Sequence, residues 1–569
     1  MGKSKKLKKV KWKTTGKNKN IKKVFIFIIM TIIIGTIAYI ANDYIILGKN
    51  KNINLIINNR NVTSNLKKEI LIEDDEIYIS KQDLGNFFDK YIYEDTKNDQ
   101  IITTYGTKMA TMSLQENKMS INGASKETYA KVIEKDGTIY IPIEELKDVY
   151  GIENKYIEES KIVTIDSISK EQKKAIITKD VPVKSSKRII AKTIDRIRQG
   201  SYVIVISEEN GYARIRTESG QLGYVKSDKI ANTVTIREEM KEEKQIKEKV
   251  NLVWDYYSTT ATAPDRTGEK LDGVNVVSPA FFYIDSKGQL KENIGESGKE
   301  YINWAHNNGY KIWPMVQNAG DGMLKVTSEI MNDYEKRQEL INQIVIACVR
   351  YKLDGINLDF ENMKKEDKEM YSRFIIELTP RIKDMGLVVS VDVTAPDGSE
   401  TWSLCFDRHV IGDVADYIVF MAYDQYGASS NKAGTTAGYD WVELSLKKFL
   451  TTEEIESEKI ILAIPLYSRL WTENSSGEII KQSAVAIKSI EKVLPSNVLK
   501  NWNDNLKQYY VEYQEEGNIK KMWIEDQRSL KEKISLVNNN NLGGIASWVK
   551  GMEYENFWTF LKNEMKGEL

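Results

Sequence analysis

The chain has 569 residues, with 82 basic and 82 acidic side chains, so its formal charge at pH 7 is zero. Residues 1–23 nevertheless contain eleven lysines and no acidic residue, and the remaining 71 basic and 82 acidic residues carry about −11. An acidic body argues against a nucleic-acid-binding protein, which normally presents a basic face. With 41% apolar and 29% charged residues, the chain is neither disordered nor a multi-span membrane protein.

The first predicted element is an uncharged apolar segment at residues 24–41, VFIFIIMTIIIGTIAYIA. Its length suits a membrane span of ~20 residues better than a signal-peptide core of ~7–15. Apolar residues continue to Ile46, and no A-x-A-like cleavage site follows. Because lysine-rich flanks stay in the cytoplasm, we predict a cytoplasmic tail at 1–23 and a single transmembrane anchor at 24–46. The body then lies outside a bacterial cell membrane; a signal peptide or a buried helix are the alternatives.

An internal repeat follows at 51–168. Residues 77–84 recur as 139–146, and residues 101–103 recur as 162–164. Each copy reads as strand, short helix, strand, which predicts a small α+β domain. The segment resembles the N-terminal domain of copper amine oxidases, although no histidine cluster supports a copper site. We expect a scaffold or wall-binding role.

Residues 174–233 contain short strand-like runs separated by glycine-bearing turns, which predict a small β-barrel domain. The runs at 203–206 and 212–215, with GYV at 223–225, resemble the bacterial Src-homology-three-like domain. Tyr212 and Tyr224 are candidates for a groove that binds wall peptides, or they pack turns. Residues 234–249 are predicted to be a charged linker.

From residue 250 to 569, eight apolar runs alternate with helix-patterned stretches. This order predicts an α/β fold, a (β/α)8 TIM barrel with catalytic groups at the carboxyl ends of the strands. A doubly wound sheet is the main rival, but no glycine-rich phosphate loop follows the first run. The runs are 252–257, 274–284, 311–316, 355–360, 387–393, 416–423, 459–467 and 543–549.

The fourth run carries the strongest chemical signal, DGINLDFE at 354–361. Residues two apart on a strand share a face, so Asn357, Asp359 and Glu361 are expected to point together into the barrel. Neighbouring carboxylates raise one another's pKa, which keeps one acid protonated near neutral pH. Such an acid is what general acid catalysis needs.

This run resembles the D-x-x-D-x-D-x-E signature of glycoside hydrolase family 18, the chitinase-like family. Met421 to Asp424 resemble its M-x-Y-D motif, and Trp548 resembles the tryptophan of the eighth strand. Residues 523–531 resemble the segment before that strand. The family uses substrate-assisted catalysis, in which the 2-acetamido oxygen of the sugar is the nucleophile.

The resemblance implies a role for each matching residue. Glu361 is expected to protonate the leaving oxygen and then activate water, while Asp359 binds the acetamido N–H. Tyr423 is expected to hold the acetamido oxygen, Asp424 to help distort the sugar, and Trp548 to form the floor of the substrate site. No metal or other cofactor is expected.

One residue departs from the signature. Asn357 stands where many relatives have an aspartate, and it resembles the spore-peptidoglycan branch of the family. We expect its amide to orient Asp359 by a hydrogen bond, since it cannot ionise. Asp354 is included among the substrate-binding candidates, and it begins the signature, where we expect it to support the strand.

The histidine and cysteine content restricts other chemistry. The chain has two histidines and two cysteines, which argues against a histidine-dependent triad or a zinc site. Cys348 and Cys405 are predicted to be buried free thiols.

These features predict a membrane-anchored extracellular enzyme that cleaves β-linked N-acetylglucosamine in peptidoglycan. A chitinase, a catalytically inactive carbohydrate-binding protein of the same fold, and a purely structural wall-tethering protein are the alternatives.

Overall fold

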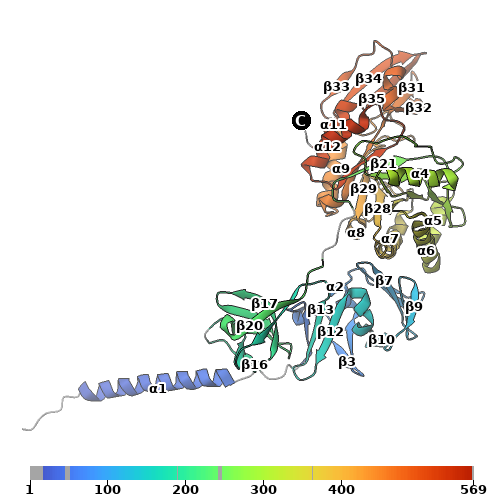
Figure 1. Cartoon of the computed structure of the whole chain (residues 1–569). Helices are drawn as coiled ribbons and strands as arrows, with labels where there is room; N and C mark the ends of the chain where they lie inside the picture. Colours follow the sequence, from blue (N-terminus) through green and yellow to red (C-terminus); the bar gives the residue numbers. More distant parts are fainter. Residues whose placement is uncertain (1–16, 45–51, 189, 241–245, 362, 567–569) are drawn as a thin grey trace, which may run out of the picture. The chain divides into compact units, whose positions relative to one another are not determined.

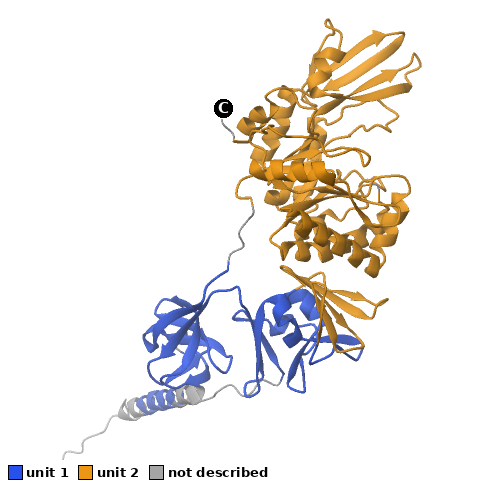
Figure 2. Cartoon of the chain, turned by 45° about the vertical axis from the view of Figure 1, so that its right-hand side comes forward, with its two compact units in different colours: residues 1–88, 128–242 blue, residues 89–127, 243–569 orange. Residues whose placement is uncertain are grey.

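The computed structural model describes residues 17–44, 52–188, 190–240, 246–361 and 363–566. It divides into two compact units (Figure 2). Unit 1 contains residues 1–88 and 128–242, and unit 2 contains residues 89–127 and 243–569. Figure 1 names the helices and strands of both units.

Helix α1 (Lys17–Tyr44) contains most of the predicted anchor. Residues 45 and 46 of that anchor, and residues 1–16 of the predicted tail, lie outside the described residues. Within the part of the chain that the structure describes, no helix is both long and apolar enough to cross a membrane.

The internal repeat appears in unit 1 as two matching sets of contacts. Strand β4 (Glu76–Ser80) leads into α2 (Lys81–Phe87), and β11 (Thr138–Pro142) leads into a short 3-10 turn and α3 (Lys147–Tyr150). The carboxylate of Asp83 accepts the backbone N–H groups of residues 67 and 68, at 2.7 and 3.1 Å. Glu145, 62 positions later, accepts those of residues 129 and 130, at 2.6 and 3.2 Å. The repeat therefore preserves a hydrogen-bonding device as well as a sequence pattern.

Two small sheets complete this repeat. In one, β4 and β11 pair antiparallel between β3 and β10. In the other, the first strand pairs parallel with the last, β1 with β13. The remaining bounds are β1 (Asn54–Ile57), β2 (Arg60–Asn61), β3 (Leu71–Glu73), β10 (Ile133–Lys135), β12 (Ile152–Ile157) and β13 (Ile162–Ser167).

A seven-stranded antiparallel sheet forms the rest of unit 1, in the order β16-β15-β19-β18-β17-β14-β20. Its last strand extends to Arg237, so the first four residues of the predicted linker, 234–237, belong to the sheet. Residues 241–245 of that linker lie outside the described residues. The bounds are β14 (Gln172–Ile177), β15 (Val181–Lys184), β16 (Thr193–Ile197), β17 (Tyr202–Glu209), β18 (Tyr212–Arg216), β19 (Leu222–Lys226) and β20 (Ile230–Arg237).

Eight parallel strand positions close into a ring in unit 2, because β36 pairs with both β21 and β30. This confirms the TIM barrel. The second position is divided between β22 and β23, and the third between β25 and β26. The bounds are β21 (Val250–Asp255), β22 (Val276–Pro279), β23 (Phe282–Ile284), β25 (Lys311–Ile312), β26 (Met315–Gln317), β27 (Gly355–Asp359), β28 (Val388–Val393), β29 (Tyr417–Met421), β30 (Ile460–Pro465) and β36 (Gly544–Trp548).

Helices cover the outside of the ring (Figure 1). Ile356, Leu358 and Phe360 belong to the large apolar cluster shared with these helices, which also contains the buried free thiols Cys348 and Cys405. The bounds are α4 (Gly295–Asn307), α5 (Met323–Met331), α6 (Tyr334–Tyr351), α7 (Lys368–Lys383), α8 (Arg408–Val414), α9 (Tyr439–Thr451), α11 (Gln527–Asn539) and α12 (Phe557–Lys566).

A five-stranded antiparallel sheet is inserted between the seventh and eighth barrel strands, a feature that the sequence pattern did not separate from the barrel. Its order is β32-β31-β35-β34-β33. The bounds are β31 (Tyr467–Glu473), β32 (Ile479–Ala486), β33 (Asn501–Asn503), β34 (Gln508–Glu515) and β35 (Asn518–Ile524).

The predicted domain at 51–168 is divided by the structure. Its middle part, residues 89–127, forms the antiparallel sheet β5–β9 and belongs to the same unit as the barrel (Figure 2). Strands β6 and β7 contact helix α7. The bounds are β5 (Tyr93–Asp95), β6 (Gln100–Tyr105), β7 (Lys108–Ser113), β8 (Lys118–Ile121) and β9 (Ala124–Glu127).

Buried charges hold this sheet on the barrel. Arg373 on α7 donates to the Tyr91 carbonyl at 2.6 Å, and its guanidinium lies 4.9 Å from the centre of the Tyr93 ring. Beside it, Glu377 is fully buried and forms a two-bond ion pair with Arg337, at 2.8 and 3.0 Å. The sheet therefore covers charges that need partners inside the protein.

We expect Glu377→Ala to lower the free energy of unfolding of unit 2 by about 3 kcal/mol, because it leaves the buried Arg337 charge without its partner. Denaturant titration followed by tryptophan fluorescence measures this, since every tryptophan except Trp12 lies at or after Trp254. The control is Glu329→Ala, whose partners are exposed lysines and which should change stability by less than about 0.5 kcal/mol. Equal effects of the two variants would contradict the assignment.

Candidate active site

The predicted carboxylates gather where β27 leaves the ring. Asn357 and Asp359 are buried, with 0% and 7% of their surface exposed. Glu361 follows two residues after Asp359 and is half-buried at the carboxyl end of the strand. Since all barrel strands are parallel, this end faces the same rim as the loops after the other strands.

The Asn318 side chain holds the backbone of Glu361 in place. The Asn318 side chain, which follows β26, accepts the Glu361 N–H at 2.9 Å and donates to the Glu361 carbonyl at 3.0 Å. Burial, together with the negative charges of Asp359 and Asp424, raises the pKa of Glu361 to about 8. Its carboxyl group is therefore largely protonated at neutral pH and can donate a proton.

Asp359 has a different partner from the one expected. Its Oδ2 accepts a hydrogen bond from Gln317 at 2.8 Å. Burial raises the pKa of Asp359 to about 6, so it is ionised at pH values where Glu361 still holds its proton. The prediction that Asn357 orients Asp359 is wrong, because the Asn357 amide is taken up by other groups.

Those groups form a buried network behind the catalytic rim. Trp254 Nε1 donates to Asn357 Oδ1 at 2.8 Å, and Asn357 Nδ2 donates to Ser390 Oγ at 3.1 Å and to Asp392 Oδ1 at 2.7 Å. Asp392 is 1% exposed. Burial raises its pKa well above the ordinary range, and the Asp359 charge adds to this.

Sequence reasoning missed Asp392. It lies in the predicted strand at 387–393, whose other residues are apolar except for Ser390. An aspartate in such a run is unusual, because aspartate is depleted in strands. The sequence contained this signal, but it could not show that Asn357 on the neighbouring strand bonds Asp392.

The next two predicted residues follow β29. Asp424 accepts hydrogen bonds from Tyr467 at 2.5 Å and from Arg469 at 2.8 Å, both on the inserted strand β31. Burial raises the pKa of Tyr423 well above its usual range, and nearby carboxylates add to this effect. Tyr423 therefore keeps its hydroxyl proton as a hydrogen-bond donor, and the insertion positions Asp424.

Trp548 ends β36 and lies within an aromatic cluster. Its ring centre is 6.4 Å from that of Tyr423, 5.8 Å from Tyr256 and 5.7 Å from Trp254. Trp548 is half-buried, whereas Tyr256 is half-exposed. The cluster offers an aromatic surface beside the carboxylates, as the prediction of a substrate floor requires.

Asp354 lies at the other end of the strand, before β27 begins. Its carboxylate bonds Lys311 at 2.9 Å, His306 at 3.0 Å and the Ile312 N–H at 3.1 Å. These contacts join the amino ends of neighbouring strands, so the structure does not place Asp354 with the other candidates, and its inclusion as a substrate-binding residue is corrected.

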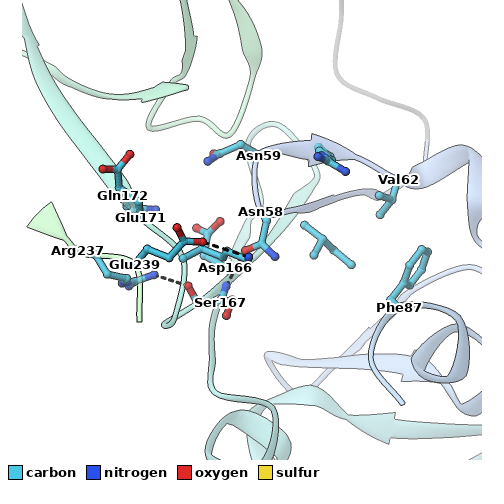
Figure 3. Close-up of a pocket in the computed structure, with 13 residues that line it drawn as sticks. Asn58, Asn59, Val62, Phe87, Asp166, Ser167, Glu171, Gln172, Arg237 and Glu239 are labelled. Atoms are coloured by element: carbon cyan, nitrogen blue, oxygen red, sulfur yellow. Dashed lines mark hydrogen bonds and ion pairs between the residues drawn. The ribbon is translucent and has the colours of Figure 1, made fainter. Parts of the chain in front are cut away.

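A polar pocket also lies in unit 1, between β1–β2 and the segments around residues 166–172 and 237–239 (Figure 3). Several of its charged groups are paired with neighbours, among them Arg237 with Glu153 at 2.6 Å and Lys170 with Glu239 at 3.6 Å.

The barrel site combines a protonated acid, an ionised carboxylate and an aromatic surface on one rim of a (β/α)8 barrel. This defines a hydrolase of the kind that cleaves sugar bonds with carboxyl groups. The model of the glycosyl hydrolases family 18 matches residues 234–553, more than half of the chain. The chain belongs to this family and is a glycoside hydrolase. The copper amine oxidase N-terminal domain model matches residues 56–165, which agrees with the resemblance of the repeat.

Several known proteins are similar to part of this chain. The uncharacterized glycosylase YvbX of Bacillus subtilis is 24% identical over 301 residues, which cover 52% of this chain and 85% of the relative. The cortical fragment-lytic enzyme of the same organism is 26% identical over 241 residues, covering 41% of this chain and 55% of the relative. A crystal structure of a chitinase from Chromobacterium violaceum matches with a TM-score of 0.49 and 22% identity, over 56% of this chain and 99% of that one.

The pKa values predict a bell-shaped pH dependence of kcat/KM. Activity should fall as the pH rises through about 8, because Glu361 loses its proton, and as it falls through about 6, because Asp359 gains one. Rates on a soluble N-acetylglucosamine oligomer between pH 4 and 10 measure both limbs. A rate that keeps rising above pH 9 would contradict the assignment of Glu361 as the acid.

Proposed function

We propose that this protein is an extracellular, membrane-anchored glycosidase that hydrolyses β-linked N-acetylglucosamine bonds in peptidoglycan. The observation that carries the proposal is the position of Glu361, an acid with raised pKa, beside the ionised Asp359 on the rim that also holds Tyr423 and Trp548.

The mechanism needs no protein nucleophile. The 2-acetamido oxygen of the bound sugar attacks the anomeric carbon while the glycosidic C–O bond breaks, and Glu361 gives its proton to the leaving oxygen. Water then attacks the same carbon and opens the cyclic cation, and Glu361 takes the proton of that water. The configuration at the anomeric carbon is retained, and Glu361 ends the cycle protonated.

The neighbouring residues support the cyclic cation. The Asp359 carboxylate accepts the acetamido N–H and offsets the positive charge, while the Tyr423 hydroxyl donates to the acetamido oxygen. Asp424, held by the inserted strand, bonds the sugar in its distorted form, and the Trp548 ring stacks under it. Such groups accelerate the reaction when they are pre-oriented toward the transition state.

Peptidoglycan is preferred over chitin as the substrate for two reasons. Asn357 resembles the spore-peptidoglycan branch of the family, and one relative is a cortical fragment-lytic enzyme. Chitin oligomers share the acetamido group that the mechanism uses, so a chitinase is the second candidate, and peptidoglycan and chitin digestion must be compared directly.

A binding protein without catalysis is the other class of function. A protein that only binds carbohydrate does not need the raised pKa of Glu361 or the two hydrogen bonds by which Asn318 holds the Glu361 backbone. The wall-peptide groove predicted near Tyr212 and Tyr224 stays a prediction; the strand register places both tyrosines on one face of the β18–β19 pair, which is compatible with a shared groove.

We expect Glu361→Gln to lower the release of reducing ends from peptidoglycan by at least about 10³-fold, because the amide cannot donate a proton. Binding of N-acetylglucosamine oligomers should persist. The control is Glu366→Gln, the same chemical change at an exposed position five residues later, which should leave the rate unchanged. Equal release by Glu361→Gln and the unaltered protein would refute the assigned role, and binding without release by the unaltered protein would support the lectin-like alternative.

The location is proposed from residues 1–46, where eleven lysines precede an uncharged apolar segment. The full chain should sediment with bacterial membranes and be digested by protease added to intact cells, whereas residues 51–569 expressed alone should not sediment. Recovery of the full chain in the soluble fraction would contradict the anchor.

A further inference from the structure

Asp392 is a buried carboxyl group that the proposed mechanism does not use. Its Oδ1 accepts the Asn357 amide at 2.7 Å. Its Oδ2 is also buried and finds no hydrogen-bond partner among the residues that the structure describes. A buried oxygen without a partner is costly in a folded protein, so a purely structural role does not account for it.

The strand register places this group next to Asp359. Asn357 pairs with Ser390 and Leu358 with Val391 across the parallel strands β27 and β28. Asp359 and Asp392 come next on the two strands. The Asn357–Asp392 bond places those two side chains on the same side of the sheet, and Asp359 shares the face of Asn357 because it lies two residues later. Two carboxyl groups at neighbouring positions in a dry interior cannot both ionise.

The groups around Asp392 determine which acid keeps the proton. Asp359 and Glu361 act on it from β27, Tyr423 from the loop after β29, and Tyr371 from helix α7. All four are acidic groups, and among the described ion pairs no cation pairs with Asp392. The side chains of Asn357 and Trp254 lower its pKa, but burial is the largest effect and the pKa remains raised. Asp392 is 1% exposed and Asp359 is 7% exposed, so the deeper Asp392 is the acid that keeps its proton. Burial raises its pKa well above the ordinary range.

We propose that Asp392 is a positioning residue: a permanently protonated carboxylic acid whose Oδ2–H donates to Asp359 when the Asp359 side chain turns inward. It supplies from β28 the ionisable partner that Asn357 cannot supply from β27. Asn357 links the two by fixing Oδ1 of Asp392, which leaves Oδ2 to carry the proton. The inference deepens the proposed function, on which its catalytic part rests.

A neutral donor beside Asp359 has one chemical effect. It stabilises the ionised form of Asp359 and so holds its pKa below that of Glu361. Asp392 neither gains nor loses a proton during turnover, so an amide that keeps a donor at the same place should replace it, whereas an apolar side chain should not.

The test compares Asp392→Asn with Asp392→Leu in the full chain, using pH–rate profiles on an N-acetylglucosamine oligomer. Asp392→Asn should keep kcat within about threefold and move neither limb, because a neutral donor remains. Asp392→Leu should lower kcat by about 10–100-fold with little change in KM. Its acidic limb should move up by about one pH unit, because Asp359 loses a donor to its ionised form. The control is Asp440→Asn at an exposed position on α9.

Two outcomes overturn the proposal. If Asp392→Asn moves both limbs to lower pH by a unit or more, Asp392 is ionised in the working enzyme and acts as a charge. If both variants lower kcat without moving the acidic limb, the residue is only structural.

A second measurement does not depend on activity and separates this proposal from the proposed function. An acid with a raised pKa keeps its proton in the folded state and loses it on unfolding, so the folded state binds one more proton than the unfolded state between pH 5 and 7. As the pH rises across this range, the free energy of unfolding of the unaltered protein should therefore fall relative to that of Asp392→Asn. The difference between the two slopes against pH should correspond to one proton. Parallel curves would refute the protonated state even if hydrolysis is found. If no substrate is hydrolysed but the slopes differ, the proposed function fails and the assignment of the proton stands.

Discussion

The ring of eight parallel strands closes where β36 pairs with β21 on one side and β30 on the other, and this closure takes Asn357, Asp359 and Asp392 out of water. Moving a carboxylate into such an interior costs several kcal/mol unless it is paired. The carboxyl groups respond by keeping protons, with Glu361 at the rim and Asp392 in the interior. The acid chemistry of the site is therefore a consequence of barrel closure.

Polar side chains near the carboxyl groups determine the role of each carboxyl group in the site. Gln317 bonds the charged form of Asp359, Asn318 clamps the backbone of Glu361, and Arg469 pairs with Asp424. Gln317 and Asn318 come from the end of β26, whereas Arg469 comes from the inserted sheet. The division of labour among similar carboxyl groups thus depends on their individual partners.

The sheet β5–β9 shows that a sequence repeat does not define a structural unit. The two copies share the capping carboxylates Asp83 and Glu145, so the local structure repeats. Yet the last strand of the first copy, β6, joins the sheet that covers the buried pair Arg337–Glu377, whereas its counterpart β13 pairs with β1. The buried Arg373 on α7 contributes to this asymmetry, because it donates to the Tyr91 carbonyl and lies beside the Tyr93 ring.

Much of the fold follows from local pattern. All eight apolar runs became barrel strands, because a strand buried on both faces needs a continuous apolar sequence. The period of two along residues 355–361 was enough to group Asn357, Asp359 and Glu361. Hydrogen-bond partners between strands do not follow from such a pattern, so Asn357 was assigned to Asp359 and Asp392 was overlooked. Asp354 was grouped with the site because it begins the same motif, although the strand carries it to the opposite end of the barrel.

By itself the sequence determined the strand order, the alternation that turns the carboxylates inward, and the uneven distribution of charge, since these are properties of neighbouring residues. Only the tertiary structure decided which carboxyl group holds a proton and which partner each side chain has. Burial and pairing depend on residues far apart in the chain, such as Asn357 and Asp392 or Asp424 and Arg469, which meet only after the ring has closed.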